Sequence, residues 1–272
     1  MSVARVQLAG IDDPRLEAYR NVRDSELLRR RGLFVAEGRL VVERLLDAVD
    51  NGYRVTSLLL NNASLASLER RISQLPDVPV YVCSTDKLAS IIGFNLHRGC
   101  LALAERPADR DPAAVVEQAE LVLVLDGVAD ADNVGSAFRN AAAFGAGAVL
   151  LSPACCDPLY RKAIRTSMGS VLRVPYARLR DWPHDLAALK SDGFTLVALT
   201  PREHATDLAA LPRREPRRKI ALLVGNEGSG LTAEAEAAAD LRVRIPMQPA
   251  IDSLNLATAT GIALYHLGRV IP

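Results

Sequence analysis

Residues 220–231 read Ile-Ala-Leu-Leu-Val-Gly-Asn-Glu-Gly-Ser-Gly-Leu. The five apolar residues predict a buried strand, and the glycine-rich loop after them leads to Thr232, which is suited to cap a helix. In open α/β sheets, ligands bind outside the carboxyl ends of the strands, where such loops lie. The stretch therefore predicts an α/β fold with a ligand site at this loop.

The same alternation extends through the second half of the chain. Mainly apolar runs predict strands at residues 121–125, 148–151, 195–199 and 220–224, and a further strand is predicted at residues 241–245. Helical patterns lie between and after them, at residues 134–144, 159–167, 183–191, 232–239 and 256–270. Near-continuous apolar strands predict a parallel sheet covered by helices on both faces.

The first half predicts a smaller α/β domain. Residues 15–46 have helical spacing of Leu and Val, residues 85–92 a second helix, and short β-type runs occupy residues 55–60, 78–83 and 100–104. A polar segment with Pro107 and Pro112 reads as a linker. We therefore expect a domain at 15–106, a linker at 107–118 and a domain at 119–272.

Composition limits the class of protein. With 49% hydrophobic and 24% charged residues among 272, the chain can bury a core and is not globally disordered. No apolar run approaches the roughly 18 residues of a membrane span, and no signal peptide is evident, so we expect a soluble, cytoplasmic protein without membrane contact. The net charge of +1 means that any RNA affinity must come from local basic patches. The four cysteines form no CxxC pair, which predicts reduced thiols and no metal site.

The glycine loop does not match the common nucleotide motifs. Its order is GxxGxG, whereas dinucleotide sites use GxGxxG, and the chain contains no P-loop. Glu227 would repel a phosphate, so the loop suits a ligand with hydroxyls or a positive charge. An NAD-dependent enzyme would carry GxGxxG at the first strand-to-helix turn, and residues 126–135 lack it.

Two further motifs also lie where strands give way to helices. The first is Asn133-Val134-Gly135-Ser136-Ala137-Phe138-Arg139, and the second is Ile245-Pro246-Met247 followed by Ser253-Leu254-Asn255. Taken alone, Asn133 reads as a helix N-cap, Arg139 as a solvated arginine, and Asp252 or Ser253 as the cap of the last helix. Ser253 lies outside any GxSxG elbow, which disfavours a serine hydrolase.

In this order, the three motifs resemble the signature of the SpoU (TrmH-type) branch of the SPOUT RNA methyltransferases. Residues 165–169 (Arg-Thr-Ser-Met-Gly) resemble the RxSMG segment of that family. Residues 34–38 and 97–99 resemble its substrate-binding domain, which is similar to ribosomal protein L30e. The resemblance implies a C-terminal parallel sheet with a trefoil knot, a small L30e-like domain, and a homodimer with the final helix in its interface.

The resemblance also implies a reaction, the transfer of a methyl group from S-adenosyl-L-methionine to a ribose 2′-hydroxyl of RNA. The implied catalytic residues are Asn133, Arg139, Glu227, Ser253 and Asn255. The implied cofactor-binding residues are Thr200, Gly225, Asn226, Gly230, Ile245 and Leu254. RNA contacts are expected from Arg23, Arg30, Arg98, Arg161 and Arg165.

Two alternatives stay open beside a ribosomal RNA substrate, which two-domain members favour. The first alternative is a transfer RNA substrate for the same reaction. A non-catalytic RNA-binding assembly factor is disfavoured, because it would be expected to have lost Arg139, Glu227, Ser253 or Asn255, and all four are present.

Overall fold

In the computed structural model, the chain divides into two compact units. Unit 1 comprises Met1–Ala108 and Leu159–Arg173, and unit 2 comprises Asp109–Pro158 and Val174–Pro272. The described residues are 5–8, 12–20, 24–75, 77–92, 99–202, 204–212, 219–248 and 250–268. The sequence places residues 159–173 in the second domain, whereas the structure groups them with the first. The functional assignment of the two predicted domains stays a prediction.

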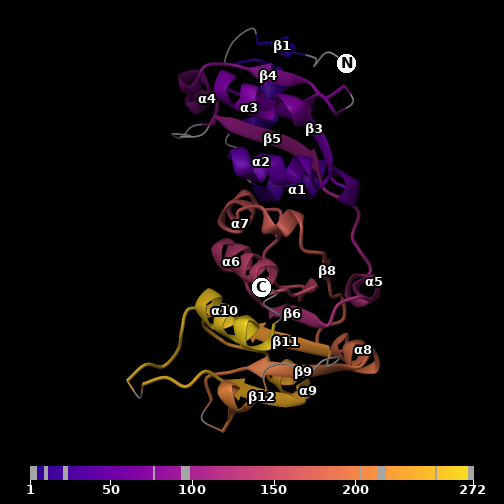
Figure 1. Cartoon of the computed structure of the whole chain (residues 1–272), viewed down its shortest axis with the longest axis vertical. Helices are drawn as coiled ribbons and strands as arrows, with labels where there is room; N and C mark the ends of the chain where they lie inside the picture. Colours follow the sequence, from indigo (N-terminus) through magenta and orange to yellow (C-terminus); the bar gives the residue numbers. More distant parts are fainter. Residues whose placement is uncertain are drawn as a thin grey trace. The chain divides into compact units, whose positions relative to one another are not determined.

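Unit 1 is built on a five-stranded mixed sheet with the order β1-β4-β3-β5-β2 (Figure 1). Its strands are β1 (Arg5–Gln7), β2 (Leu33–Glu37), β3 (Arg54–Leu60), β4 (Val80–Val82) and β5 (Cys100–Glu105). β1, β4 and β3 run parallel, and β5 is antiparallel to both of its neighbours. Its helices are η1 (Pro14–Tyr19), α1 (Asp24–Arg31), α2 (Arg39–Leu46), η2 (Val49–Asn51), α3 (Asn62–Ile72), α4 (Thr85–Ile92), α7 (Arg161–Thr166) and η3 (Ser170–Leu172).

Hydrogen bonds attach the inserted segment with α7 and η3 to the rest of unit 1. The Arg161 N–H donates to Asp24 Oδ2 at 2.8 Å, and the Arg44 side chain donates to the Met168 carbonyl. Gly169 adopts a φ of +82°, and a Cβ there would stand 3.2 Å from Arg44 Cδ. The RxSMG-like segment therefore has a structural role in this chain, because its glycine allows the close approach of Arg44.

Unit 1 differs from the sequence expectations at one predicted element and contains one helix that the sequence did not predict. The helical reading of residues 15–46 fails because β2 lies inside this stretch, bounded by Gly32 and Gly38, whose φ angles are +63° and +94°. Helix α3 was not foreseen, although Leu65, Leu68 and Ile72 are buried along one face at helical spacing. The glycines carried the missing signal for β2, and the i, i+3, i+7 pattern carried it for α3.

Unit 2 contains a seven-stranded, wholly parallel sheet with the order β10-β12-β9-β11-β6-β7-β8. The five predicted strands are confirmed as β6 (Leu121–Asp126), β7 (Ala148–Leu151), β9 (Phe194–Leu199), β11 (Lys219–Gly225) and β12 (Leu241–Arg244). The sequence missed the two edge strands, β8 (Tyr176–Arg178) and β10 (Thr206–Asp207). The register sets Gly225 beside Asp126 and Val224 beside Leu199, so the three central strands end at one level.

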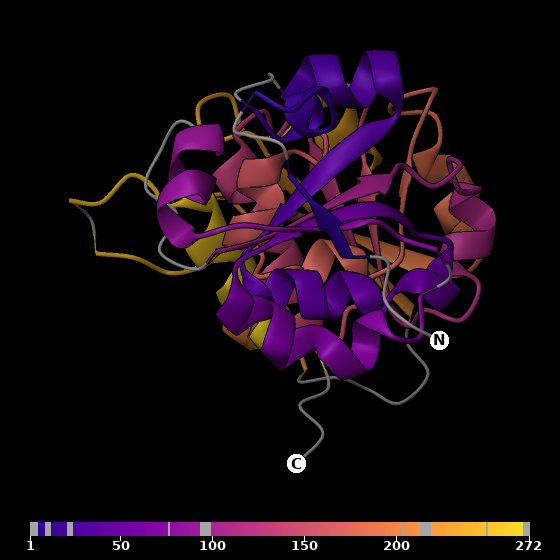
Figure 2. The ribbon, with the colours of Figure 1, turned by 90° about the horizontal axis from the view of Figure 1, so that it is seen from above.

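Helices cover both faces of this sheet, as predicted for a parallel sheet (Figure 1). One face carries α6 (Ala131–Ala143) and α10 (Leu256–Leu267), and the other carries α5 (Pro112–Val116), α8 (Leu186–Ser191) and α9 (Ala233–Ala238). The segment between β12 and α10 projects from unit 2 in both views (Figure 2). The trefoil threading implied by the resemblance stays a prediction. Within the described residues, no helix is long and apolar enough to cross a membrane.

Candidate functional site

The three sequence motifs meet at the carboxyl edge of the unit 2 sheet. A pocket of about 300 Å³ lies there, lined by the segment after β9, by the loop after β11, and by parts of the segment that leads into α10. Its lining includes six residues predicted to bind the cofactor, namely Thr200, Gly225, Asn226, Gly230, Ile245 and Leu254. Glu227 and Ser253, predicted to be catalytic, line it as well.

A chain of hydrogen bonds joins one residue from each motif. Asn255 Nδ2 donates to Asn133 Oδ1 at 3.4 Å, and Asn133 Nδ2 donates to Glu227 Oε1. In each of these two hydrogen bonds, the donor and acceptor residues are more than ninety positions apart in the sequence. Asn133 therefore uses both ends of its amide to connect the other two motifs, and the partner of Glu227 in this chain is an asparagine.

Two capping assignments made from the sequence are wrong. The N-cap of α6 is Asp130, whose Oδ1 accepts from the backbone N–H groups of Asp132 and Asn133 at 2.7 and 3.2 Å. The N-cap of α10 is Asn255, whose Oδ1 accepts from Ala257 and Thr258 at 3.0 and 3.3 Å. The Asn133 side chain therefore does not cap α6. The Asn255 side chain both caps α10 and contacts Asn133.

The glycine loop closes on itself. Asn226 and Gly230 exchange backbone hydrogen bonds of 3.0 and 2.9 Å, and Asn226 Oδ1 accepts from the N–H of Gly228 at 2.8 Å. A Cβ on Gly225 would overlap the backbone of Gly230 and Leu231. The Asn226 amide also donates to the Gly127 carbonyl at 3.0 Å, which fixes the loop to the end of β6.

Sequence reasoning missed a buried carboxylate beneath this loop. Asp126 is 3% exposed, and its Oδ2 accepts from both the backbone N–H and the hydroxyl of Thr232, each at 2.8 Å. It therefore holds the start of α9 against the end of β6. The available signal was an acidic residue directly after five apolar strand residues, because a buried charge needs dedicated partners.

Arg139 does not line the 300 Å³ pocket. It is exposed on α6 and borders a separate, open hollow of about 560 Å³ between α6 and α10. The two helices are joined there by Asn140 Nδ2, which donates to the Ala257 carbonyl at 2.7 Å. Within a single chain, the predicted catalytic arginine and the predicted cofactor residues thus line different hollows.

The profile of the SpoU rRNA methylase family matches residues 120–265, more than half of the chain. This chain belongs to the SpoU family. Its methyl donor is S-adenosyl-L-methionine, and its activity is RNA 2′-O-ribose methylation.

Several SpoU relatives match over nearly their whole length. An uncharacterised tRNA/rRNA methyltransferase of Mycobacterium tuberculosis is 45% identical over 95% of this chain and 90% of its own. The Bacillus subtilis 23S rRNA (guanosine(2553)-2′-O)-methyltransferase is 25% identical over 96% of this chain and 98% of its own. A solved AdoMet-bound rRNA methyltransferase from Sinorhizobium meliloti has 25% identity and a TM-score of 0.82, with 97% of each chain covered.

The pocket of this SpoU protein fits S-adenosyl-L-methionine in size and chemistry. Its volume of about 300 Å³ is at the lower end of the range for small-molecule sites, roughly 300–1,000 Å³. Aliphatic side chains such as Leu199, Leu231 and Ile245 suit a flat adenine, and the glycine loop brings backbone groups close.

The four cysteines are free and none lines this pocket. Burial raises the pKa of Cys156 to about 11, so its thiolate is scarce at neutral pH.

The arginines predicted to contact RNA differ in their accessibility. Arg23 and Arg98 lie outside the described residues. Arg161 is only 12% exposed, with its Nε 3.8 Å from Asp24 Oδ1. Arg30 pairs with Glu26 at 3.2 Å, and Arg165 is largely exposed, 3.9 Å from Glu37. The contacts of Arg161 attach α7 to α1 within unit 1, which leaves Arg30 and Arg165 as the accessible members of the described set.

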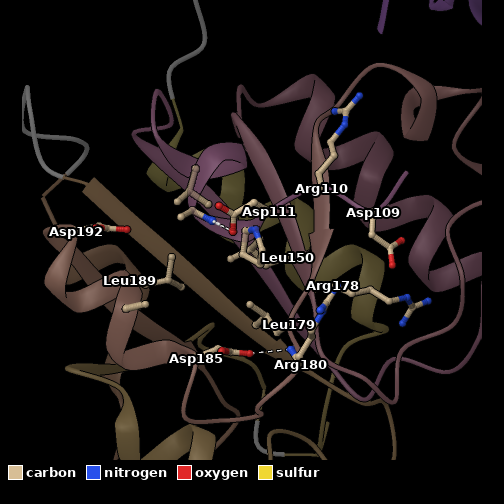
Figure 3. A pocket seen from close by; sticks show the side chains of 14 residues that line it. Asp109, Arg110, Asp111, Leu150, Arg178, Leu179, Arg180, Asp185, Leu189 and Asp192 are labelled. Carbon is tan, nitrogen blue, oxygen red and sulfur yellow. Dashed lines mark hydrogen bonds between the residues drawn. The ribbon is translucent and has the colours of Figure 1, made fainter. Parts of the chain in front are cut away.

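A further cavity of unit 2, of about 520 Å³, lies between α5, α8 and the end of β8 (Figure 3). Its apolar lining includes Leu150, Leu179 and Leu189. Asp185 Oδ2 at its rim accepts from the N–H groups of Arg180 and Asp181, at 2.8 and 2.9 Å. This cavity contains no motif residue, and the Asp185 contacts stabilise a turn. The motifs therefore select the smaller pocket as the site.

Proposed function

We propose that this protein methylates the 2′-hydroxyl of a ribose in ribosomal RNA, as a homodimer. The observation that carries the proposal is the hydrogen-bonded chain from Asn255 through Asn133 to Glu227, at the edge of the cofactor pocket. It gives this edge a fixed set of amide and carboxylate groups, which suits the positioning of a ribose. The cytoplasmic location expected from the sequence is part of this proposal.

In this proposal the protein contributes alignment and charge. S-adenosyl-L-methionine supplies an electrophilic methyl group. Asn133, Ser253 and Asn255 would hold the ribose at the edge of the pocket, and such positioning can account for roughly 7–11 kcal/mol of a barrier. The guanidinium of Arg139 is a permanent positive charge, and it acts as a cation that stabilises the developing alkoxide.

A dimer explains why Arg139 lies outside the pocket of its own chain. Ile262 and Tyr265 on α10 are 40% and 52% exposed, and Tyr265 packs edge-to-face on Phe144, with ring centroids 5.7 Å apart. Exposed apolar side chains on paired helices favour association with another surface. We propose that a second copy covers this α6–α10 surface and that each Arg139 serves the partner's pocket.

Ribosomal RNA is proposed because relatives similar over their whole length are named rRNA methyltransferases. The 45% identical relative is named a tRNA/rRNA methyltransferase, so its name does not distinguish between the two kinds of RNA. Mapping of 2′-O-methyl sites in total RNA, from cells with and without the protein, decides between them. A lost methyl group in tRNA alone would contradict the rRNA proposal, and no lost methyl group in any RNA would support an assembly factor.

Arg139 provides the direct test of the mechanism. We expect Arg139→Ala to lower the methyl-transfer rate at least about 100-fold, while the affinity for S-adenosylhomocysteine, measured by calorimetry, stays within about twofold. Arg139→Lys keeps the charge but loses the planar guanidinium, so partial recovery would assign the role to charge. Full turnover in Arg139→Ala would remove this residue from the reaction.

A further inference from the structure

A buried carboxylate that lines the cofactor pocket belongs to none of the three motifs. Glu236 lies on α9, lines the pocket, and has a side chain that is 7% exposed. Its Oε1 has no hydrogen-bond partner among the described residues. A carboxylate buried to this degree requires positive partners, and their identity indicates what it does.

Two arginines provide this positive charge. Arg202 Nη2 lies 3.3 Å from Glu236 Oε2, and Arg242 Nε lies 3.8 Å from Oε1. Arg242 also donates through Nη2 to the Glu236 backbone carbonyl at 2.9 Å. Arg242 therefore anchors α9 to β12, whereas Arg202 comes from the segment after β9 and itself lines the pocket.

Arg202 is the single cation among the described residues that line this pocket. The other charged residues there are Glu227, which accepts from Asn133, and the buried Glu236. S-adenosyl-L-methionine carries a sulfonium, an ammonium and one carboxylate. The carboxylate is the single negative group of this ligand, and Arg202 is the one described cationic residue in the pocket wall that could bind it.

We infer that Arg202 binds the carboxylate of the methionine part of the cofactor and that Glu236 is a positioning residue for Arg202. A guanidinium has five N–H donors in a rigid plane, so contact with Glu236 through Nη2 leaves donors for a second carboxylate. The Arg202 side chain is 59% exposed, which keeps these donors accessible. The inference deepens the cofactor assignment and does not depend on which RNA is methylated.

The test compares two ligands that differ in the amino-acid part. S-adenosylhomocysteine has the carboxylate, and 5′-methylthioadenosine lacks the whole amino-acid end. We expect Arg202→Ala to lower the affinity for S-adenosylhomocysteine, measured by calorimetry, about tenfold. The affinity for 5′-methylthioadenosine should not change. Arg244→Ala is the matched control, because Arg244 pairs with Asp207 through Nε at 2.8 Å and does not line the pocket. It should change neither affinity.

The role of Glu236 is tested by combining variants. Glu236→Gln nearly preserves the shape of the side chain but removes the charge that holds Arg202. It should therefore lower the affinity for S-adenosylhomocysteine and leave the affinity for 5′-methylthioadenosine unchanged. Because it acts through Arg202, it should add no further loss to Arg202→Ala. Thermal unfolding without ligand identifies any general loss of structure.

Three outcomes would overturn the inference. Equal weakening of both ligands by Arg202→Ala would mean that Arg202 only shapes the pocket wall. Unchanged affinity for both would mean that it does not touch the cofactor, and a loss confined to RNA binding would reassign it to a phosphate contact. If the unaltered protein bound neither ligand, the cofactor assignment itself would be wrong. If the substrate proved not to be ribosomal RNA, the affinities for both ligands would not be affected.

Discussion

At the end of β11 the chain turns back so tightly that Asn226 and Gly230 face each other in two hydrogen bonds. Gly225 makes this possible, since a Cβ there would occupy the space of the Gly230 and Leu231 backbone. Overlap with backbone atoms cannot be relieved by a side-chain rotation. The loop shape, and with it one wall of the 300 Å³ pocket, therefore depends on a single missing methyl group.

We expect Gly225→Ala to lower the free energy of unfolding by about 1–3 kcal/mol, the usual cost of overpacking, and to weaken S-adenosylhomocysteine binding. Gly228→Ala is the control for stability, because a Cβ there would meet only Asn226 Oδ1 at an ordinary 3.5 Å. Urea unfolding of both variants measures the difference. Equal stability of the two alanine variants would show that the loop can open at no cost.

At the scale of the element, α10 begins at a residue with two duties. Asn255 accepts hydrogen bonds from the first turn of α10 through Oδ1 and donates to Asn133 through Nδ2. An asparagine can do both, because its amide has an acceptor and a donor end. The same side chain therefore sets where the helix starts and completes the polar chain at the pocket edge.

Substitutions can separate these two duties. Asn255→Asp keeps the capping oxygen but has no donor for Asn133 at neutral pH, so we expect an unchanged free energy of unfolding and strongly reduced methyl transfer. Asn255→Ala removes both, and should in addition cost about 1 kcal/mol of stability through the lost cap. Chemical unfolding and a methylation assay measure the two effects. If Asn255→Asp retained full activity, the contact with Asn133 would have no part in the reaction.

Individual elements show what the sequence could and could not predict. β6, β9 and β11 are predictable because strands buried on both faces are almost continuously apolar. The edge strands β8 and β10 have only three and two residues and include Arg178 and Asp207, so they carry no such signal. β2 was hidden because Leu and Val also fit a helix, and only the flanking glycines distinguish the two.

The site shows the same limit. The motifs gave the residues around the pocket, but not which of two nearby polar residues caps a helix. Asp130 and Asn133 are both good caps, and only the course of the backbone selects Asp130. Glu236 could not be found from spacing, because its partners come from β12 and the segment after β9.

At the scale of the whole molecule, the separation of Arg139 from its own pocket leads to a prediction about subunit exchange. In a symmetric dimer that uses the α6–α10 surface, the pocket of one copy would contain its own Asn133 and the partner's arginine. Arg139→Ala and Asn133→Ala should each be inactive alone. A mixed dimer would then hold one pocket with both residues intact and one pocket with neither.

Mixing the two inactive variants in equal amounts should therefore restore methyl transfer. Random exchange makes half of the dimers mixed, each with one complete site of two, so about a quarter of the original activity is expected. If Arg139 served its own chain, every pocket in the mixture would lack one residue and no activity would return. A third variant, Ile262→Glu, places a charge on the exposed face of α10 and should prevent both dimer formation and the recovery, as light scattering and the same assay would show.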